Sequence, residues 1–184
     1  MIRLFVALAL PEAIRAHLAG LGGGVPGASW TPPDNFHLTL RFVGDVDQGV
    51  AAEIDTALTT VEAPGWVFWL EGVGHFGNGA KPRVLWAGVR PNPALDHLHL
   101  KIESALVRVG LAPEARRYAP HITLARLHNP DADRVGRFLG ERALFQAGPI
   151  AADRFTLFES CNGRHGPIYR PLQDYPLTNP PPAV

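Results

Sequence analysis

PHITLAR at residues 120–126 has a close copy upstream, FHLTLRF at residues 36–42. Both copies read His-aliphatic-Thr-Leu, and their histidines, His37 and His121, lie 84 positions apart (121 minus 37). Each copy is followed within eight residues by a turn and the start of a helix. A lone His-x-Thr on a strand is usually a solvated strand face. Two copies in equivalent contexts indicate an internal duplication.

Alternation within each copy predicts a strand, because successive side chains of a strand point to opposite faces. In the first copy the histidine and the threonine then share one face with Arg41, while the two leucines and Phe42 face the core. In the second copy the histidine and the threonine also share a face, but strict alternation puts Arg126 with the core residues. A β-bulge near Ala125 would turn Arg126 toward the polar face.

The two halves of the chain repeat one order of elements: strand, proline-started helix, loop, His-x-Thr strand, helix. Residues 84–110 follow the plan of residues 2–21, and residues 121–139 follow that of residues 37–58. This repeat predicts an α+β fold of two pseudo-symmetric lobes, each with a mostly antiparallel sheet and outer helices. The polar faces of the two motif strands would meet in a central groove.

Apolar patterns and turn residues position the remaining elements. Strands outside the motifs are predicted at residues 2–10, 66–73, 84–89, 150–159 and 167–172, and helices are predicted to begin near Pro11, Asp45 or Asp47, Asn92 and Asn129. Residues 30–33 would form a stiff connector and residues 75–82 a loop. We expect one bilobal domain over residues 1–178 and a flexible tail over residues 179–184.

Composition and charge are those of an ordinary globular protein. The formal net charge is zero and the pI is near 7.1, which argues against a broad polyanion-binding surface. A nucleic acid would therefore be held at a small site, such as a strand end. The single cysteine, Cys161, excludes an internal disulfide and fits a reducing compartment. No CxxC or HExxH spacing offers a metal site.

The apolar run from Leu4 to Leu10 reads as a buried first strand rather than as a signal peptide, because Pro11 and Glu12 end it without a cleavage site. No other segment approaches the roughly 18 apolar residues that a membrane span needs. We therefore expect a cytoplasmic protein that does not enter a membrane and that acts as a monomer.

Two histidines across one groove suit acid–base chemistry at a phosphate. Imidazole has an unperturbed pKa of about 6.5, so near neutral pH one ring can take a proton while the other gives one. Thr39 and Thr123 can donate hydrogen bonds to a bound oxygen, and Arg126 can add charge-assisted ones. No serine, cysteine or carboxylate adjoins either histidine, and there is no P-loop. The pattern predicts in-line displacement at phosphorus without metal or cofactor.

The paired His-x-Thr motifs resemble those of the 2H phosphoesterases. Three phrases are similar to the bacterial RNA 2′,3′-cyclic phosphodiesterases, also called 2′-5′ RNA ligases: HLTLRFVGD at 37–45, KPRVLWAG at 81–88 and PHITLAR at 120–126. The resemblance covers nearly the whole chain. It departs at Ala119, where a basic or larger residue is expected, so one possible RNA contact stays in question.

The resemblance implies that the substrate is an RNA end with a 2′,3′-cyclic phosphate, or a small cyclic nucleotide, which water opens to a 2′-phosphate. It also implies that His121 is the base and His37 the acid, although the sequence alone does not order them. Thr39, Thr123 and Arg126 would hold the non-bridging oxygens. The same site would allow reversible 2′-5′ ligation.

Side chains near the motifs are candidates for RNA contacts. Phe42 and Tyr118 could stack on the terminal base, although its alternation makes Phe42 a better candidate for core packing. Lys81 and Arg83 could steer the RNA phosphates or be ordinary solvated charges. Of the six other histidines, which match no threonine, five are expected on the surface or on helix faces, with His75 nearest the groove: His75, His97, His99, His128 and His165.

Three other functions stay open. The chain could hydrolyse another cyclic phosphodiester, such as ADP-ribose cyclic phosphate, and a comparison of kcat/KM values would separate these substrates. It could also be a non-catalytic nucleotide- or RNA-binding module, although binding alone needs no acid–base pair. A metal-dependent hydrolase is the weakest alternative, because two histidines with threonines make a poor ligand set.

Overall fold

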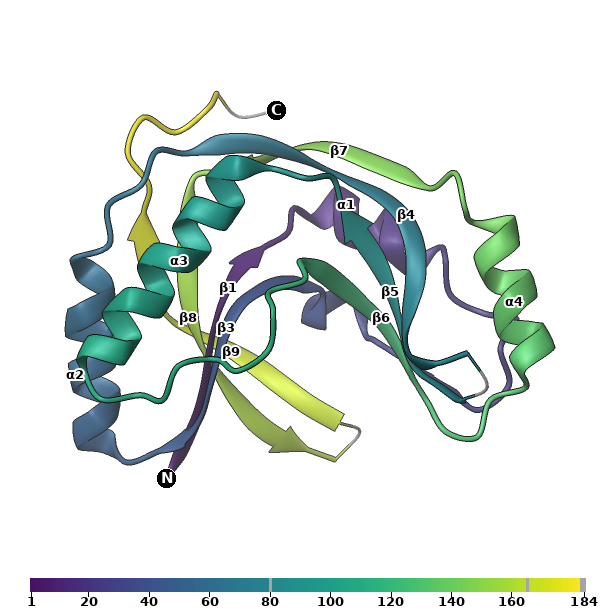
Figure 1. Cartoon of the computed structure of the whole chain (residues 1–184), viewed down its shortest axis with the longest axis horizontal. Helices are drawn as coiled ribbons and strands as arrows, with labels where there is room; N and C mark the ends of the chain where they lie inside the picture. The colour runs from purple at the N-terminus through teal and green to yellow at the C-terminus, as the bar shows by residue number, and fades with distance from the viewer. Residues whose placement is uncertain (80, 165, 183–184) are drawn as a thin grey trace.

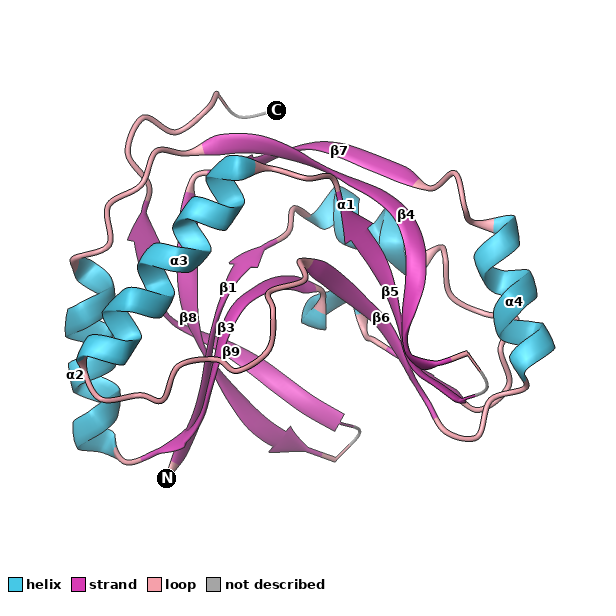
Figure 2. Ribbon diagram, in the orientation of Figure 1, coloured by secondary structure: helices cyan, strands magenta, loops and turns pink. Residues whose placement is uncertain are grey.

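The fold is built on two antiparallel sheets, with helices on the periphery (Figures 1 and 2). The computed structural model describes residues 1–79, 81–164 and 166–182. The first sheet has the order β3-β1-β8-β9, with β3 His37–Val46, β1 Ile2–Ala9, β8 Arg154–Gly163 and β9 Gly166–Pro176. The second has the order β2-β6-β5-β4-β7, with β2 Ala28–Trp30, β6 His121–Leu127, β5 Lys81–Val89, β4 Trp66–Asn78 and β7 Gln146–Ala152.

Polar caps fix where three of the four helices begin. The helices are α1 Glu12–Ala19, α2 Gln48–Thr59, α3 Pro93–Arg108 and α4 Ala132–Glu141, and a 3-10 turn covers Pro33–Asn35. The side chains of Asp47, Asn92 and Asp131 accept hydrogen bonds from the first free backbone N–H groups of α2, α3 and α4. No helix of the described residues is both long and apolar enough to span a membrane.

The predicted duplication is confirmed by the strand pairing. In each half the first strand pairs antiparallel with the motif strand, β1 with β3 and β5 with β6. The halves also interlock, because β2 joins the sheet of the second motif while β8 and β9 complete the sheet of the first. The α+β fold with two antiparallel sheets is as expected, and the crossings tie both lobes into one structure.

The same irregularity occurs in both motif strands. In β3, Leu40 is an extra residue between the pairs Ala7–Thr39 and Val6–Arg41. In β6, Leu124 is likewise extra, because Thr123 pairs with Trp86 and Ala125 with Leu85. A bulge puts two successive residues on one face and reverses the alternation beyond it. The two bulges occupy equivalent positions of the repeat.

These bulges confirm one expectation and overturn another. Ala125 is buried and Arg126 is exposed, so Arg126 is turned to the polar face as predicted, with the bulge at Leu124. In β3, however, Arg41 is buried and Phe42 is 58% exposed. The predicted orientations of Arg41 and Phe42 are therefore wrong, because strict alternation ignored the bulge.

Three smaller differences concern where strands and loops begin and end. The strand expected at residues 150–159 is two strands, because β7 belongs to the second sheet and β8 to the first, with Asp153 between them. The described residues of the loop expected at residues 75–82 form the end of the β4–β5 hairpin, and Ala80 lies outside the described residues. The connector at residues 30–33 includes the end of β2 and the start of the 3-10 turn. His165 and the last two residues of the expected tail lie outside the described residues.

Candidate active site

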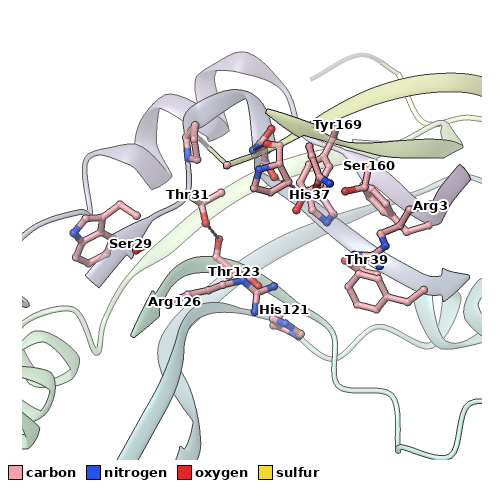
Figure 3. Close-up of a pocket in the computed structure, with 18 of the residues that line it drawn as sticks. Arg3, Ser29, Thr31, His37, Thr39, His121, Thr123, Arg126, Ser160 and Tyr169 are labelled. Carbon is pink, nitrogen blue, oxygen red and sulfur yellow. Dashed lines mark hydrogen bonds between the residues drawn. The ribbon is translucent and has the colours of Figure 1, made fainter. Parts of the chain in front are cut away.

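A groove of about 680 Å³ between the two sheets is lined by both motif pairs. His37 and Thr39 come from β3, and His121 and Thr123 come from β6 on the other side (Figure 3). The other lining residues are Arg3, Phe5, Ser29, Trp30, Thr31, Pro32, Asn35, Phe42, Gly44, Arg126, Ser160, Asn162, Gly166, Pro167 and Tyr169. The structure therefore brings the two predicted pairs together in one cavity.

Both imidazoles are held in the same way. Nδ1 of His37 lies 2.7 Å from the carbonyl oxygen of Asn35, and Nδ1 of His121 lies 2.7 Å from that of Ala119. A carbonyl can only accept, so the hydrogen is assigned to Nδ1 and Nε2 is left to exchange a proton. Since Ala119 acts through its backbone, the departure noted at this position does not affect this contact.

Aromatic neighbours make the surroundings of both histidines apolar. The His37 ring lies 4.8 Å from the Phe5 ring and 5.1 Å, edge-on, from the Tyr169 ring. The His121 ring lies perpendicular to Phe76 at 4.7 Å. These side chains limit hydration of the rings, which disfavours the charged imidazolium.

The pKa values of both histidines follow from this burial. Burial lowers the pKa of His37 below its ordinary 6.5; the hydrogen bond to Asn35 opposes the shift, and the charge of His121 adds to it. Burial also lowers the pKa of His121, against the opposing hydrogen bond to Ala119. Both imidazoles of the free protein therefore lose their protons at a lower pH than an exposed histidine.

The groove also supplies hydrogen-bond donors and a cation. Thr31 donates from Oγ1 to the backbone oxygen of Thr123 at 2.9 Å, which ties β2 to the second motif. Arg126 is exposed in the groove and has no hydrogen-bond or ion-pair partner among the residues that the structure describes. Its guanidinium is thus available to an anionic ligand beside the two threonine hydroxyls.

Three predicted contact residues lie elsewhere. Tyr118 is not in the groove: its ring stacks on His99 at 3.8 Å between centroids, and its hydroxyl donates to the backbone oxygen of Thr39 at 3.1 Å. Lys81 and Arg83 lie on β5 next to the hairpin turn, outside the lining of the groove. His75 does not line the groove either. Tyr118 thus contacts the first motif strand, β3, from outside the groove.

The sequence interpretation missed lining residues on strands that carry no motif. Leu4, Val6 and Leu8 point to the core, so Arg3 and Phe5 of the same strand point to the groove. The alternation is present in the sequence, but the residues on the groove side include the apolar Phe5 and Ala7. Leu4 to Leu10 therefore appear as one apolar run. Ser160 comes from β8, which pairs with β1, and Tyr169 comes from β9, which pairs with β8; no local pattern predicts this order of strands.

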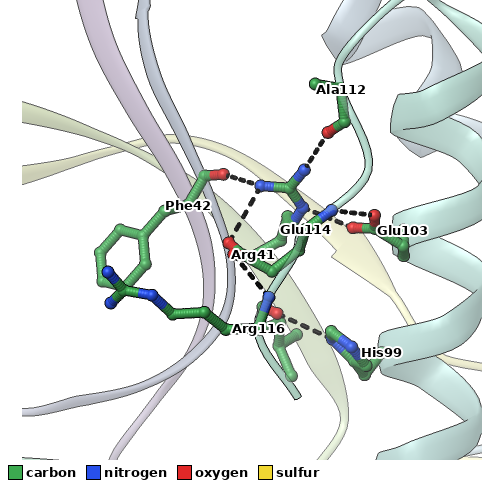
Figure 4. A network of polar contacts seen from close by, with 8 residues as sticks. Arg41, Phe42, His99, Glu103, Ala112, Glu114 and Arg116 are labelled. Carbon is green, nitrogen blue, oxygen red and sulfur yellow. Dashed lines mark hydrogen bonds and ion pairs between the residues drawn. The ribbon is translucent and has the colours of Figure 1, made fainter. Parts of the chain in front are cut away.

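A buried arginine links the first motif strand to the segment that leads to the second. Arg41 is 8% exposed; its Nε donates to Glu103 on α3, and its two terminal nitrogens donate to the backbone oxygens of Phe42 at 2.5 Å and Ala112 at 2.6 Å (Figure 4). Glu103 in turn accepts from the backbone N–H of Glu114 at 2.8 Å. The segment before His121 is thereby fixed against β3.

The comparison with protein families agrees with this architecture. The model described as LigT like Phosphoesterase matches twice, over residues 8–86 and 89–169, and each match contains one His-x-Thr motif. The chain belongs to the LigT-like phosphoesterase family. This is the 2H phosphoesterase family that the two motifs resemble.

Individual LigT-like proteins are similar over most of the chain. A protein of Aeropyrum pernix named RNA 2′,3′-cyclic phosphodiesterase is 34% identical over 143 residues, which are 77% of this chain and 81% of that protein. One of Archaeoglobus fulgidus with the same name is 32% identical over 93% of this chain and 98% of its own length. The crystal structure of E. coli LigT complexed with 3′-AMP has a TM-score of 0.75 at 28% identity, covering 96% of this chain and 98% of that one.

Proposed function

We propose that this LigT-like protein hydrolyses 2′,3′-cyclic phosphate ends of RNA to 2′-phosphates by acid–base catalysis between His37 and His121. The observation that carries the proposal is the matched pair of imidazoles, each held through Nδ1 with Nε2 left for proton transfer, in a groove that also contains Arg126. The names of the relatives and the 3′-AMP complex of E. coli LigT support a nucleotide phosphate as the ligand.

The reaction needs one proton removed and one supplied. One imidazole takes a proton from water as the water oxygen bonds to phosphorus. The other gives its proton to the 3′ oxygen as the P–O3′ bond breaks, which leaves a 2′-phosphate. Thr39, Thr123 and Arg126 donate to the non-bridging oxygens and stabilise the charge that develops there. A 5′-hydroxyl in place of water would give a 2′-5′ linkage, the reversible ligation.

The roles of the two histidines follow the family order in this proposal, with His121 as base and His37 as acid. In the free groove burial lowers the pKa of both rings, and the charge of His121 also lowers that of His37, which is compatible with either order. A bound phosphate stabilises the charge on the imidazole nearest to it. A substrate with sulfur in place of the 3′ oxygen separates the two, since sulfur departs without a proton.

The terminal base is proposed to stack on Phe42. This side chain is 58% exposed on the groove wall, and stacking of a base on an aromatic ring contributes about 1–3 kcal/mol. Tyr118, Lys81 and Arg83 are left out of the proposed site because they do not line the groove. The groove is formed by one chain, and the single cysteine fits a reducing compartment, which supports a monomer that acts in the cytoplasm.

The proposal is tested with a short RNA ending in a 2′,3′-cyclic phosphate, in excess chelator. We expect turnover to a 2′-phosphate that the chelator does not affect, because the proposed donors include no metal. A 3′-phosphate product would contradict the bond assignment, and inhibition by chelator would reveal a metal. Binding without turnover would make the groove a binding module. A higher kcat/KM for ADP-ribose cyclic phosphate than for RNA would assign the site to that substrate.

The pH dependence of kcat/KM is expected to be bell-shaped, with its maximum on the acidic side of the ordinary histidine pKa of 6.5. The pKa values of both histidines are lowered in the folded protein. The rate therefore falls as the pH rises through the lowered pKa of the acid, because the acid loses its proton. The rate also falls below the lowered pKa of the base, because the base must be neutral to act. Rates measured from about pH 5 to 9 test this, and a flat profile or a maximum on the alkaline side would contradict it.

A further inference from the structure

The groove carries a second cation away from the two motifs. Arg3 and Arg126 both line it, and no carboxylate is among the described lining residues (Figure 3). The whole chain has a formal net charge of zero, so this groove is more positive than the protein as a whole. Arg126 lies with the catalytic pairs, which leaves Arg3 without a role in the reaction at the cyclic phosphate. Two guanidinium groups along one groove suit a ligand with more than one anionic group.

The register of β1 and β3 gives the order of side chains along the groove. Thr39 of the motif lies opposite Ala7, Phe42 lies opposite Phe5, and Arg3 comes two residues further along β1. Four residues of strand, about 13 Å, separate the Cα atoms of Ala7 and Arg3. The groove wall therefore presents a phosphate site, then an aromatic pair, then a cation. A nucleotide phosphorylated at both ends of its ribose presents a cyclic phosphate, then the ribose with its base to one side, then a 5′-phosphate, so it offers one anionic group to each end of this wall.

The guanidinium of Arg3 is oriented and still has free donors. Nε and one terminal nitrogen donate to Asp45 at 3.1 and 2.5 Å, and Asp45 is its only partner among the described residues. Five N–H groups are available on an arginine, so the other terminal nitrogen is left for an anion. The side chains of the pair are 60% and 44% exposed, and exposed pairs of this kind are weak. Asp45 thus orients the fork and offsets part of its charge, while its own carboxylate does not line the groove.

We propose that Arg3 binds the 5′-phosphate of the same terminal nucleotide whose 2′,3′-cyclic phosphate lies between the two histidines. This inference rests on the proposed function and deepens it. The preferred substrate is then an RNA end, or a nucleotide that carries a 5′-phosphate, and a nucleoside 2′,3′-cyclic phosphate without that group is a poorer one. The contact positions the nucleotide and takes no part in proton transfer.

The test compares two substrates that differ only in the 5′-phosphate: adenosine 2′,3′-cyclic phosphate, with and without it. The measured quantity is the ratio of their kcat/KM values, so that any general change of the site cancels. Wild type is expected to favour the 5′-phosphorylated substrate about tenfold, which corresponds to one charge-assisted hydrogen bond. Arg3→Ala is expected to bring the ratio close to one, and Arg3→Lys to retain part of it.

A control variant and a second measurement make the result specific. Arg154 is also on the first sheet and paired with carboxylates, but it does not line the groove, so Arg154→Ala should keep the wild-type ratio. On an RNA substrate, Arg3→Ala should also reduce the dependence of log kcat/KM on log salt by about 0.7, as for one lost phosphate contact on a single strand.

The outcomes separate this inference from the function on which it rests. A wild-type ratio near one, or a ratio that Arg3→Ala leaves unchanged, would overturn the role of Arg3 while the hydrolysis itself stands. Absence of turnover with both substrates and with RNA would overturn the proposed function, and this inference with it. A ratio that falls equally in Arg154→Ala would show a general effect of surface charge, which also contradicts the proposal.

Discussion

Replacing His121 or His37 with alanine is expected to lower kcat on an RNA 2′,3′-cyclic phosphate about 10²–10⁴-fold, the usual contribution of a general acid or base. KM should change much less, because Thr39, Thr123 and Arg126 stay in place to hold the phosphate. The two losses should not multiply in the double variant, because acid and base act in one displacement. Single-turnover rates at the pH of the wild-type maximum provide the measurement.

A matched control and a modified substrate complete this prediction. His97 is exposed on α3 and lies outside the groove, so His97→Ala should turn over like wild type. A cyclic substrate with sulfur in place of the 3′ oxygen should restore much of the rate in the variant that lacks the acid, and none in the variant that lacks the base. Rescue of His37→Ala supports the family order, and rescue of His121→Ala reverses it. Activity above a tenth of wild type in both alanine variants would contradict two-histidine catalysis.

The sequence was sufficient to predict what repeats. Two His-x-Thr strands, each followed by a helix and preceded by a strand-helix unit, predicted the duplication and the central groove, and the pairing of β1 with β3 and of β5 with β6 confirms the repeat. The helix starts were also predictable, since Asp47 and Asn92 cap α2 and α3 through local hydrogen bonds. These features depend on residues close together in the sequence.

What the sequence did not predict depends on partners far apart in the chain. Ten residues of β3 pair with eight of β1, and the extra residue at Leu40 reverses Arg41 and Phe42. Tyr118 was expected to stack on a nucleobase, but its hydroxyl donates a hydrogen bond to the backbone oxygen of Thr39, 79 positions away. Arg3 lines the groove because β1 pairs between β3 and β8. Register between strands is not a local property, so local patterns could not supply it.

Replacing Arg41 with methionine is expected to lower the free energy of unfolding by about 3 kcal/mol, as for other buried ion pairs that lose one partner. Methionine keeps much of the volume but leaves Glu103 without its cation and the carbonyls of Phe42 and Ala112 without a donor. For a chain of this length the loss corresponds to a fall in Tm of roughly 10 °C. Urea unfolding followed by tryptophan fluorescence measures it.

The control is the same substitution at an exposed pair. Arg90 and Glu71 are 43% and 45% exposed, so Arg90→Met should cost less than about 1 kcal/mol. Glu103→Leu should also destabilise, and the double variant Arg41→Met with Glu103→Leu should lose about 0.5–3 kcal/mol less than these two single losses together, because they share one contact. Equal costs for Arg41→Met and Arg90→Met would contradict a structural role for the buried pair.

The stability of the Arg41–Glu103 pair should also depend on pH in one direction. Burial raises the pKa of Glu103, but the hydrogen bond from Glu114 and the contacts with Arg41 outweigh it and bring the pKa below the ordinary 4.5. A carboxylate with a lowered folded pKa stabilises the protein above its unfolded pKa, and this contribution disappears as the pH falls through the folded value. Wild type should therefore lose more stability than Glu103→Gln between neutral pH and about pH 3. Because the pair holds the segment before His121 against β3, the same acid titration should loosen the second motif before the first.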